Sequence, residues 1–85
     1  MKLKKTVFKN CLLKEVDFTT ADLQEASFEQ SDLEGAQFNG ADLRKADFRG
    51  AHSCFFDLQE VKIKGAKMDA IEAVNLLRTL GIEIE

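Results

Sequence analysis

The chain has 85 residues, no proline, tryptophan or tyrosine, and a formal net charge of −3 at pH 7. This length predicts one small domain, and the mild acidic balance argues against a general nucleic-acid binder, which normally carries a basic excess. No run approaches the length of a membrane span, and two cysteines with one histidine share no metal-ligand spacing. We therefore expect no metal, no cofactor, and no direct contact with membranes or nucleic acid.

Residues 6–68 follow a repeat of five residues that never slips in register. The first residue of a unit is small, most often Ala, and the second is often Asp. The third is large and apolar, with Phe and Leu in alternation: Phe8, Leu13, Phe18, Leu23, Phe28, Leu33, Phe38, Leu43 and Phe48. Repetition at a fixed period is the signature of a repeat architecture.

A period of five fits neither a straight helix nor a straight strand. Five residues advance about 500° around an α-helix, and an odd step places residue i+5 on the opposite face of a strand. The chain must therefore turn once per unit, which predicts an all-β solenoid of stacked coils. With four units per coil, Phe stacks on Phe and Leu on Leu in neighbouring coils, and the coil is still wide enough to enclose these side chains. Residues twenty apart then form ladders: Phe8, Phe28 and Phe48; Phe18 and Phe38; Leu13 and Leu33; Leu23 and Leu43.

The outward positions support the same spacing of twenty. Lys14 and Glu34 place opposite charges one coil apart, although an exposed pair contributes only about 0–1 kcal/mol. Asp22 and Asp42 place like charges together, at a lower cost if each accepts a hydrogen bond from a corner N–H. The glycines of the repeat close their units, where a corner requires unusual dihedrals: Gly35, Gly40 and Gly50.

The N-terminal end of the predicted solenoid looks unprotected. Val7 and Leu12 occupy outward positions that are polar in later units, and no element covers the first turn. The lysines of the run Met1–Lys5 discourage edge pairing. Two explanations stay open: the chain is a segment of a longer solenoid, or it pairs through this end.

Residues 52–60 depart from the consensus while the count of five continues. Ser53 replaces a large residue, and Phe56 stands beside Phe55 where a small residue belongs. We expect a distorted corner with one Phe turned outward or covering the end of the core. A contact of this Phe pair with a partner is the alternative. His52 is expected on the surface.

The two cysteines fall in different environments. Cys11 stands in the small slot of its unit and is expected to be buried and inert. Cys54 lies in the irregular stretch and is expected to be exposed. Unpaired thiols without a signal peptide suggest a cytoplasmic protein.

The C-terminal stretch predicts a helix from Asp69 to about Leu80. Asp69 and Glu72 have the spacing of a capping box, and Gly81 suits the position after the helix. One apolar face can lie across the open end of the solenoid, and its residues are Ala70, Ala73, Val74, Leu77 and Leu80.

This helix has more apolar surface than one contact needs. Ile71 and Leu76 widen the arc beyond the stripe of about 100° that a single packed face uses, and the tail Ile82–Glu85 alternates like an edge strand. We predict a homodimer contact at this end, with a monomeric cap as the alternative. The contact residues would be Ile71, Leu76, Leu77, Leu80, Ile82 and Ile84.

Units such as ADLQE, SDLEG, ADLRK and ADFRG resemble the pentapeptide repeat family, whose consensus is A(D/N)LXX. The resemblance implies a right-handed quadrilateral β-helix, here of about three coils over residues 1–68. It also implies that residues 69–85 cap the coil within the same domain and mediate dimerisation, as in many bacterial members. The quinolone-resistance proteins of this family are described as DNA mimics that bind DNA gyrase.

Two functions remain after these steps. The first is a non-catalytic binding module for a protein that binds DNA, such as gyrase, with outward aspartates in place of phosphates: Asp17, Asp22, Asp32, Asp42 and Asp47. The second is a structural, self-assembling solenoid with no client enzyme. Enzyme activity is not expected, because nothing pairs a nucleophile with a base and so narrow a solenoid has no interior cavity.

Overall fold

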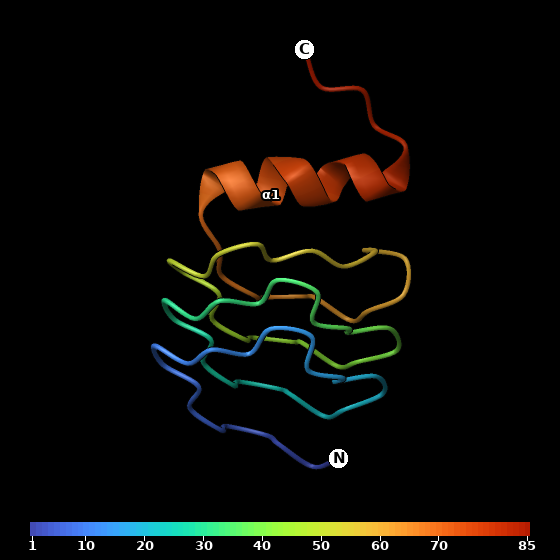
Figure 1. Ribbon diagram of the computed structural model, residues 1–85. Helices are drawn as coiled ribbons and strands as arrows, with labels where there is room; N and C mark the ends of the chain where they lie inside the picture. The colour runs from blue at the N-terminus through green and yellow to red at the C-terminus, as the bar shows by residue number, and fades with distance from the viewer.

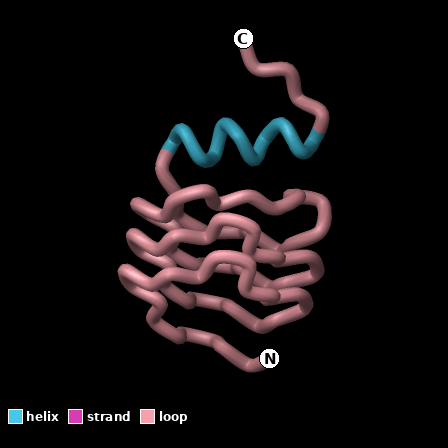
Figure 2. Tube along the Cα trace, viewed as in Figure 1, coloured by secondary structure: helices cyan, strands magenta, loops and turns pink.

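The computed structural model describes all 85 residues as a stack of coils with one helix across its end (Figure 1). The bridges between coils are all parallel, and all join residues twenty apart, as in Lys2↔Asp22, Asp22↔Asp42 and Asp42↔Lys62. The bridges are isolated, so the solenoid contains no regular strand (Figure 2). The spacing predicted from the sequence is therefore the spacing of the backbone pairing.

The corners of the regular units are tight turns whose third residue is left-handed. In the first unit the Thr6 N–H donates to the Leu3 carbonyl at 3.1 Å, and Lys5 has a φ of 62°, as in a type II turn. A non-glycine residue in this region is strained by roughly 1–2 kcal/mol. The strain is offset because the Lys5 N–H donates to the Gln24 carbonyl of the next coil at 2.9 Å. Positive φ recurs at the last residue of later units, including Gly35, Gly40 and Gly50.

Two aromatic ladders fill the centre of the solenoid. Phe28 stacks between Phe8 and Phe48, with ring centroids 5.1 and 4.9 Å apart. Phe18 stacks on Phe38 at 5.2 Å, and the two ladders meet edge to face. Burial of each such side chain contributes about 1.5–3 kcal/mol. The leucine ladders complete the core with fully buried members in the middle coils: Leu23, Leu33 and Leu43.

Ser31 is the one buried polar residue, and it replaces Ala in a small slot. Its hydroxyl donates to the Phe8 carbonyl and accepts from the Cys11 N–H, the latter at 3.0 Å. At most other corners the equivalent N–H and carbonyl bond to each other directly. The hydroxyl therefore takes the place of one turn hydrogen bond, and no buried side-chain polar atom is left without a partner.

The irregular stretch turns one Phe inward and the other outward, as expected. Phe56 is buried, and its ring lies 5.4 Å from that of Phe38 and 5.6 Å from that of Phe48. Phe55 is 64% exposed. The count of five survives, because Lys62 bridges back to the coil below in the regular register.

Both expectations for the cysteines are wrong. Ser53 adopts a φ of 57° only three residues after the corner at Gly50, so the inward alternation shifts and Cys54 enters the core. Cys11 is only half-buried, because it lies in the first coil and no coil covers it from the other side.

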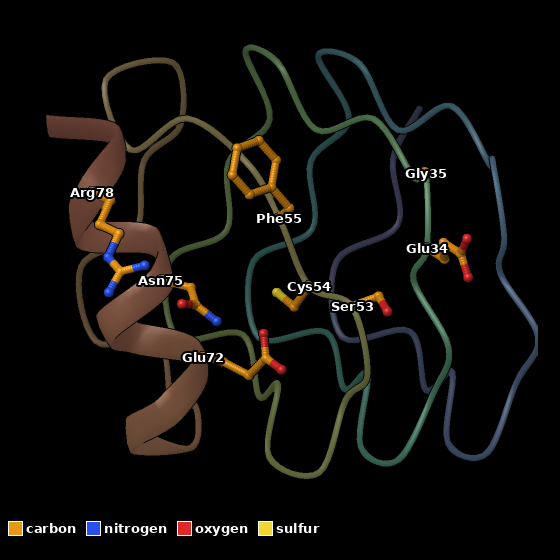
Figure 3. A pocket seen from close by; sticks show the side chains of 8 residues that line it. All are labelled: Glu34, Gly35, Ser53, Cys54, Phe55, Glu72, Asn75 and Arg78. Atoms are coloured by element: carbon orange, nitrogen blue, oxygen red, sulfur yellow. The ribbon is translucent and has the colours of Figure 1, made fainter. Parts of the chain in front are cut away.

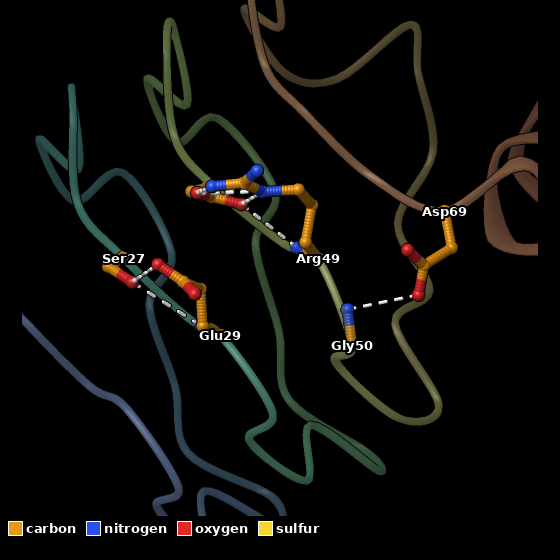
Figure 4. A network of polar contacts seen from close by, with 6 residues as sticks. Ser27, Glu29, Arg49, Gly50 and Asp69 are labelled. Atoms are coloured by element: carbon orange, nitrogen blue, oxygen red, sulfur yellow. Dashed lines mark hydrogen bonds and ion pairs between the residues drawn. The ribbon is translucent and has the colours of Figure 1, made fainter.

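Helix α1 spans Ala70–Leu77 and continues as the 3₁₀ helix η1, Arg78–Leu80, which ends at Gly81 with a φ of 80°. Asp69 is the N-cap residue, as predicted, but the capping box does not form. The Asp69 carboxylate instead accepts a hydrogen bond from the Gly50 N–H at 2.9 Å (Figure 4). This bond ties the start of the helix to the coil below it.

The helix packs on the solenoid through a face other than the predicted one. Leu76 is 1% exposed and is the one buried residue of α1, whereas Leu77 and Leu80 are 38% and 42% exposed. The Thr79 hydroxyl accepts from the Leu58 N–H at 3.1 Å and donates to the Leu76 carbonyl at 2.7 Å. These bonds turn the edge that carries Leu76 and Thr79 toward the coil, so Leu76 is not a dimer contact.

Replacing Phe28 with Ala removes the middle ring of the longer ladder. We expect the free energy of unfolding to fall by about 3–5 kcal/mol, because the cavity is closed on both sides by neighbouring rings. Urea denaturation measures the change. Phe55→Ala is the matched control, with an expected change within about 0.5 kcal/mol because its ring is exposed. Equal losses in the two variants would contradict the ladder as the main source of stability.

Candidate partner-binding surface

The five aspartates predicted to bind a partner all help to build the corners. The Oδ1 atom of Asp17 accepts a hydrogen bond from the Thr19 N–H at 2.9 Å. The other four accept from the N–H two residues later at 3.0–3.2 Å: Asp22, Asp32, Asp42 and Asp47. This is the turn geometry that Asp favours. The repeated Asp therefore has a structural role that requires no partner.

Two of the five aspartates are paired with arginines. Arg44 approaches Asp42 and Arg49 approaches Asp47, each with a nitrogen–oxygen distance of 2.7 Å. The hydrogen bonds from these guanidinium groups lower the pKa of both carboxyls. Both aspartates present a paired charge, which makes them poor substitutes for DNA phosphates.

Charge is sorted between two sides of the solenoid. The bridges place the units 1–5, 21–25, 41–45 and 61–65 on one face, and the units that directly follow them on the next. These two faces form the basic side and hold ten of the twelve basic residues: Lys2, Lys4, Lys5, Lys9, Arg44, Lys45, Arg49, Lys62, Lys64 and Lys67. The other two faces form the acidic side, whose acidic residues are Glu15, Asp17, Asp32, Glu34, Asp57 and Glu60.

The acidic side has a single basic residue, Lys14. Its ammonium lies 3.8 Å from Asp32 and 4.0 Å from Glu34. The Lys14 and Glu34 side chains are more than half exposed, and such pairs contribute only about 0–1 kcal/mol. The acidic side therefore keeps an excess of negative charge.

This sorting divides the predicted aspartates between the two sides. Asp17 and Asp32 belong to the acidic side, whereas Asp22, Asp42 and Asp47 belong to the basic side. The acidic side also has four residues that were not predicted: Glu15, Glu34, Asp57 and Glu60. The signal for them was present in the sequence, because a spacing of twenty assigns each outward residue to a face.

An open groove of about 690 Å³ lies between α1 and the coil below it, next to the acidic side (Figure 3). Glu34 and Glu72 line the groove, and so do Arg78 and the exposed ring of Phe55. Exposed aromatic rings beside polar groups are typical of surfaces that bind other proteins. The groove extends the acidic side into a candidate contact surface for a protein partner.

The groove offers no activated nucleophile. Burial raises the pKa of the Cys54 thiol to about 12, so the thiol stays protonated at neutral pH and is a poor nucleophile. No group of three or more His, Cys, Asp or Glu side chains could hold a metal ion. Neither helix has the length and apolarity needed to cross a membrane.

The outer surface of the C-terminal end carries the other predicted contact. Five of the six residues predicted for a dimer are exposed, by 36–77%: Ile71, Leu77, Leu80, Ile82 and Ile84. The sixth, Leu76, is buried against the solenoid. Exposed apolar side chains gathered at one end are typical of an interaction site.

The pairing of Asp47 with Arg49 predicts a dependence of stability on pH. A carboxyl whose pKa is lowered by folding stabilises the protein fully above its ordinary pKa of 3.8, and the stabilisation is lost as the pH falls below that value. Asp47→Asn keeps the oxygen that accepts the turn hydrogen bond but removes the charge. We expect this variant to lose less stability than the parent between pH 5 and pH 2.

Urea denaturation at several pH values measures this difference. Asp22→Asn is the matched control, because residue 24 is Gln and no arginine pairs with Asp22. Parallel pH profiles for the parent and Asp47→Asn would show that the ion pair does not contribute.

A family model described as Pentapeptide repeats (8 copies) matches the chain over residues 2–40, 11–50 and 31–70. No curated protein matches the sequence. Among solved structures, the chain is similar to a pentapeptide repeat protein from Nostoc Pcc 7120, with a TM-score of 0.68 and 32% identity over 80% of this chain and 56% of that one.

The chain is also similar to trypsin-treated QnrB1, a plasmid-mediated fluoroquinolone resistance protein. The TM-score is 0.50 and the identity 28%, over 99% of this chain and 43% of QnrB1. The chain thus spans about half the length of these two proteins. With the repeats matched by the family model and the coils paired at a spacing of twenty, the chain belongs to the pentapeptide repeat family.

Proposed function

We propose that the protein is a non-catalytic binding module whose acidic side occupies the DNA-binding surface of a partner protein such as gyrase. The sorting of charge onto two sides carries this proposal, because a one-sided negative field attracts a basic DNA-binding surface. Three coils at about 4.8 Å each give the six carboxylates a density of roughly one charge per 2.4 Å. Duplex DNA has about one charge per 1.7 Å, so the two densities are comparable.

The partner class is supported by the similarity to QnrB1. QnrB1 is a fluoroquinolone resistance protein, and nearly the whole of this chain aligns with it. The exposed Phe55 ring beside the acidic side adds an apolar anchor for a protein partner. The proposed site is therefore the acidic side with the groove, in place of the five aspartates taken as one set.

A gyrase supercoiling assay tests the proposal. We expect the protein to inhibit supercoiling at micromolar concentration, and Glu34→Lys with Glu60→Lys to weaken inhibition at least about tenfold by reversing charge on the acidic side. The control is Glu25→Lys with Glu29→Lys, which makes the same charge change on the basic side and should keep most of the inhibition.

Two results would count against the proposal. The first is a parent protein that neither inhibits gyrase nor protects it from a fluoroquinolone. The second is an equal loss of inhibition in both double variants, because a response to net charge alone would need no acidic side.

We also propose that residues 1–68 and 69–85 form one domain, that the coil is right-handed as in the family, and that two copies associate through the outer face of α1. Ile71 is 77% exposed, and Leu77 lies on the same helix outside the packed edge. A structural role without a client enzyme is the second candidate function. It is favoured by the unpaired backbone edge of the first coil, where the N–H and carbonyl of Lys2 make no hydrogen bond.

Light scattering tests the contact at α1. Ile71→Glu with Leu77→Glu places two charges in the proposed contact. In dilute protein at high salt, we expect the mass to fall from dimer to monomer because buried unpaired charges are costly. Asn39→Glu is the control, since it adds a charge at an exposed position of the solenoid, away from α1. An unchanged mass in the double variant would rule out this contact.

A further inference from the structure

The two ends of the solenoid carry features that have no partner within the chain. The first coil has an open backbone edge, and the tail Ile82–Glu85 extends beyond α1 without any strand. Figure 1 shows the N-terminus at one end of the molecule and the C-terminus at the other. The longest dimension is 36 Å, so the tail cannot reach the open edge of its own chain.

The open edge presents regularly spaced donors and acceptors. In the second coil, the Asp22 N–H donates to the Met1 carbonyl at 2.9 Å, and the Asp22 carbonyl accepts from the Leu3 N–H at 2.8 Å. The equivalent N–H and carbonyl groups of the first coil make no hydrogen bond: those of Lys2, Val7, Leu12 and Asp17. An edge of this kind is a template for pairing with another extended segment.

The core is also uncovered at this end. Phe8 and Leu13 are only half-buried, whereas their ladder partners Phe28 and Leu33 are at most 1% exposed. Val7 and Leu12 are 67% and 81% exposed. The end of the first coil therefore combines apolar surface with unpaired backbone.

The tail has the residue pattern of the extended part of a repeat unit. Ile82-Glu83-Ile84 repeats the order apolar, charged, apolar that is found in Val16-Asp17-Phe18 and Val61-Lys62-Ile63. In the solenoid, the charged residue of this triplet points outward, and the apolar residues on either side point inward. The tail makes no backbone hydrogen bond of its own, so its groups are free to pair.

Charge selects between the possible occupants of the open edge. Two N-terminal ends placed face to face would bring together two sets of Lys2, Lys4 and Lys5, which repel each other. The tail carries Glu83 and Glu85, which complement these lysines. The occupant that fits best is therefore the tail of a second copy.

We propose that the tail of one copy adds as a parallel strand to the edge at Met1–Leu3 of the next copy, in the manner of β-strand addition. The Lys2 N–H donates to the Ile82 carbonyl of the second copy, and its Ile84 N–H donates to the Lys2 carbonyl. The two isoleucines cover the open core, and Glu83 lies beside Lys2. This contact is head to tail, so it generates open chains of copies instead of a closed dimer.

The inference is independent of the binding of gyrase and of the contact at α1. All measurements are made on the Ile71→Glu, Leu77→Glu background so that the outer face of α1 does not contribute. The average mass is followed by sedimentation with rising protein concentration, at low and at high salt. We expect a mass that rises with concentration and falls with salt, because the contact depends on ion pairs at the surface.

Charge reversal at either end separates this contact from others. Glu83→Lys with Glu85→Lys and Lys2→Glu with Lys4→Glu should each weaken association at least about tenfold. An equimolar mixture of the two variants should associate again, because the reversed tail of one then meets the reversed edge of the other. Circular dichroism checks that both variants keep the fold.

Three results would overturn the proposal. The first is a background protein that stays monomeric at every concentration. The second is association that survives reversal of both tail glutamates, which would point to pairing of two N-terminal ends. The third is a mixture of the two variants that associates no better than either variant alone.

Discussion

Hydrogen bonds between backbones twenty residues apart are the constraint on which this structure depends. A unit of five residues has no stable conformation alone, because its corner requires a left-handed residue. The strain of the corner is offset only when the N–H of its left-handed residue donates a hydrogen bond to a carbonyl of the next coil. The Lys5 N–H donates to the Gln24 carbonyl in this way. Because every coil repeats this pairing, side chains at the same position stack directly, and the aromatic ladders follow from the backbone.

The same constraint gives each face its own chemistry. Outward residues twenty apart lie on the same face of the stack. A preference for one sign of charge on one of the four faces is therefore repeated in each coil. The Asp of the repeat is shared by all faces because it closes corners. The residues that differ between faces are those one and two positions after the large apolar residue, such as Arg44 and Glu34. Any recognition of a partner must therefore depend on these variable positions more than on the repeated Asp.

Most of the fold could be predicted because it depends on local spacing. The period of five, the alternation of Phe and Leu, and the glycines at corners are all properties of neighbouring units. The errors arose where distant segments meet. The helix is rotated by the bond between Thr79 and Leu58, and the hydrophobic pattern alone placed Leu77 in the contact that Leu76 makes. Likewise, the inward position of Cys54 depends on an extra corner at Ser53, which is not a residue type that marks such corners.

The candidate surface was less predictable for a related reason. The sequence repeat groups the aspartates by their position in the five-residue unit, whereas a partner would contact the residues of one face. Asp42 and Asp17 share a slot, yet one is paired with an arginine and the other lies on a side with a single lysine.

A solenoid has no built-in limit to its length, so its ends differ physically from its middle. One end is closed here by Leu76 and by the hydrogen bond that the Gly50 N–H donates to Asp69, while the other leaves the half-buried Phe8 at the surface. An occupant of that open edge would complete hydrogen bonds and cover apolar surface at once, so the least stable coil is also the one that gains most from a partner.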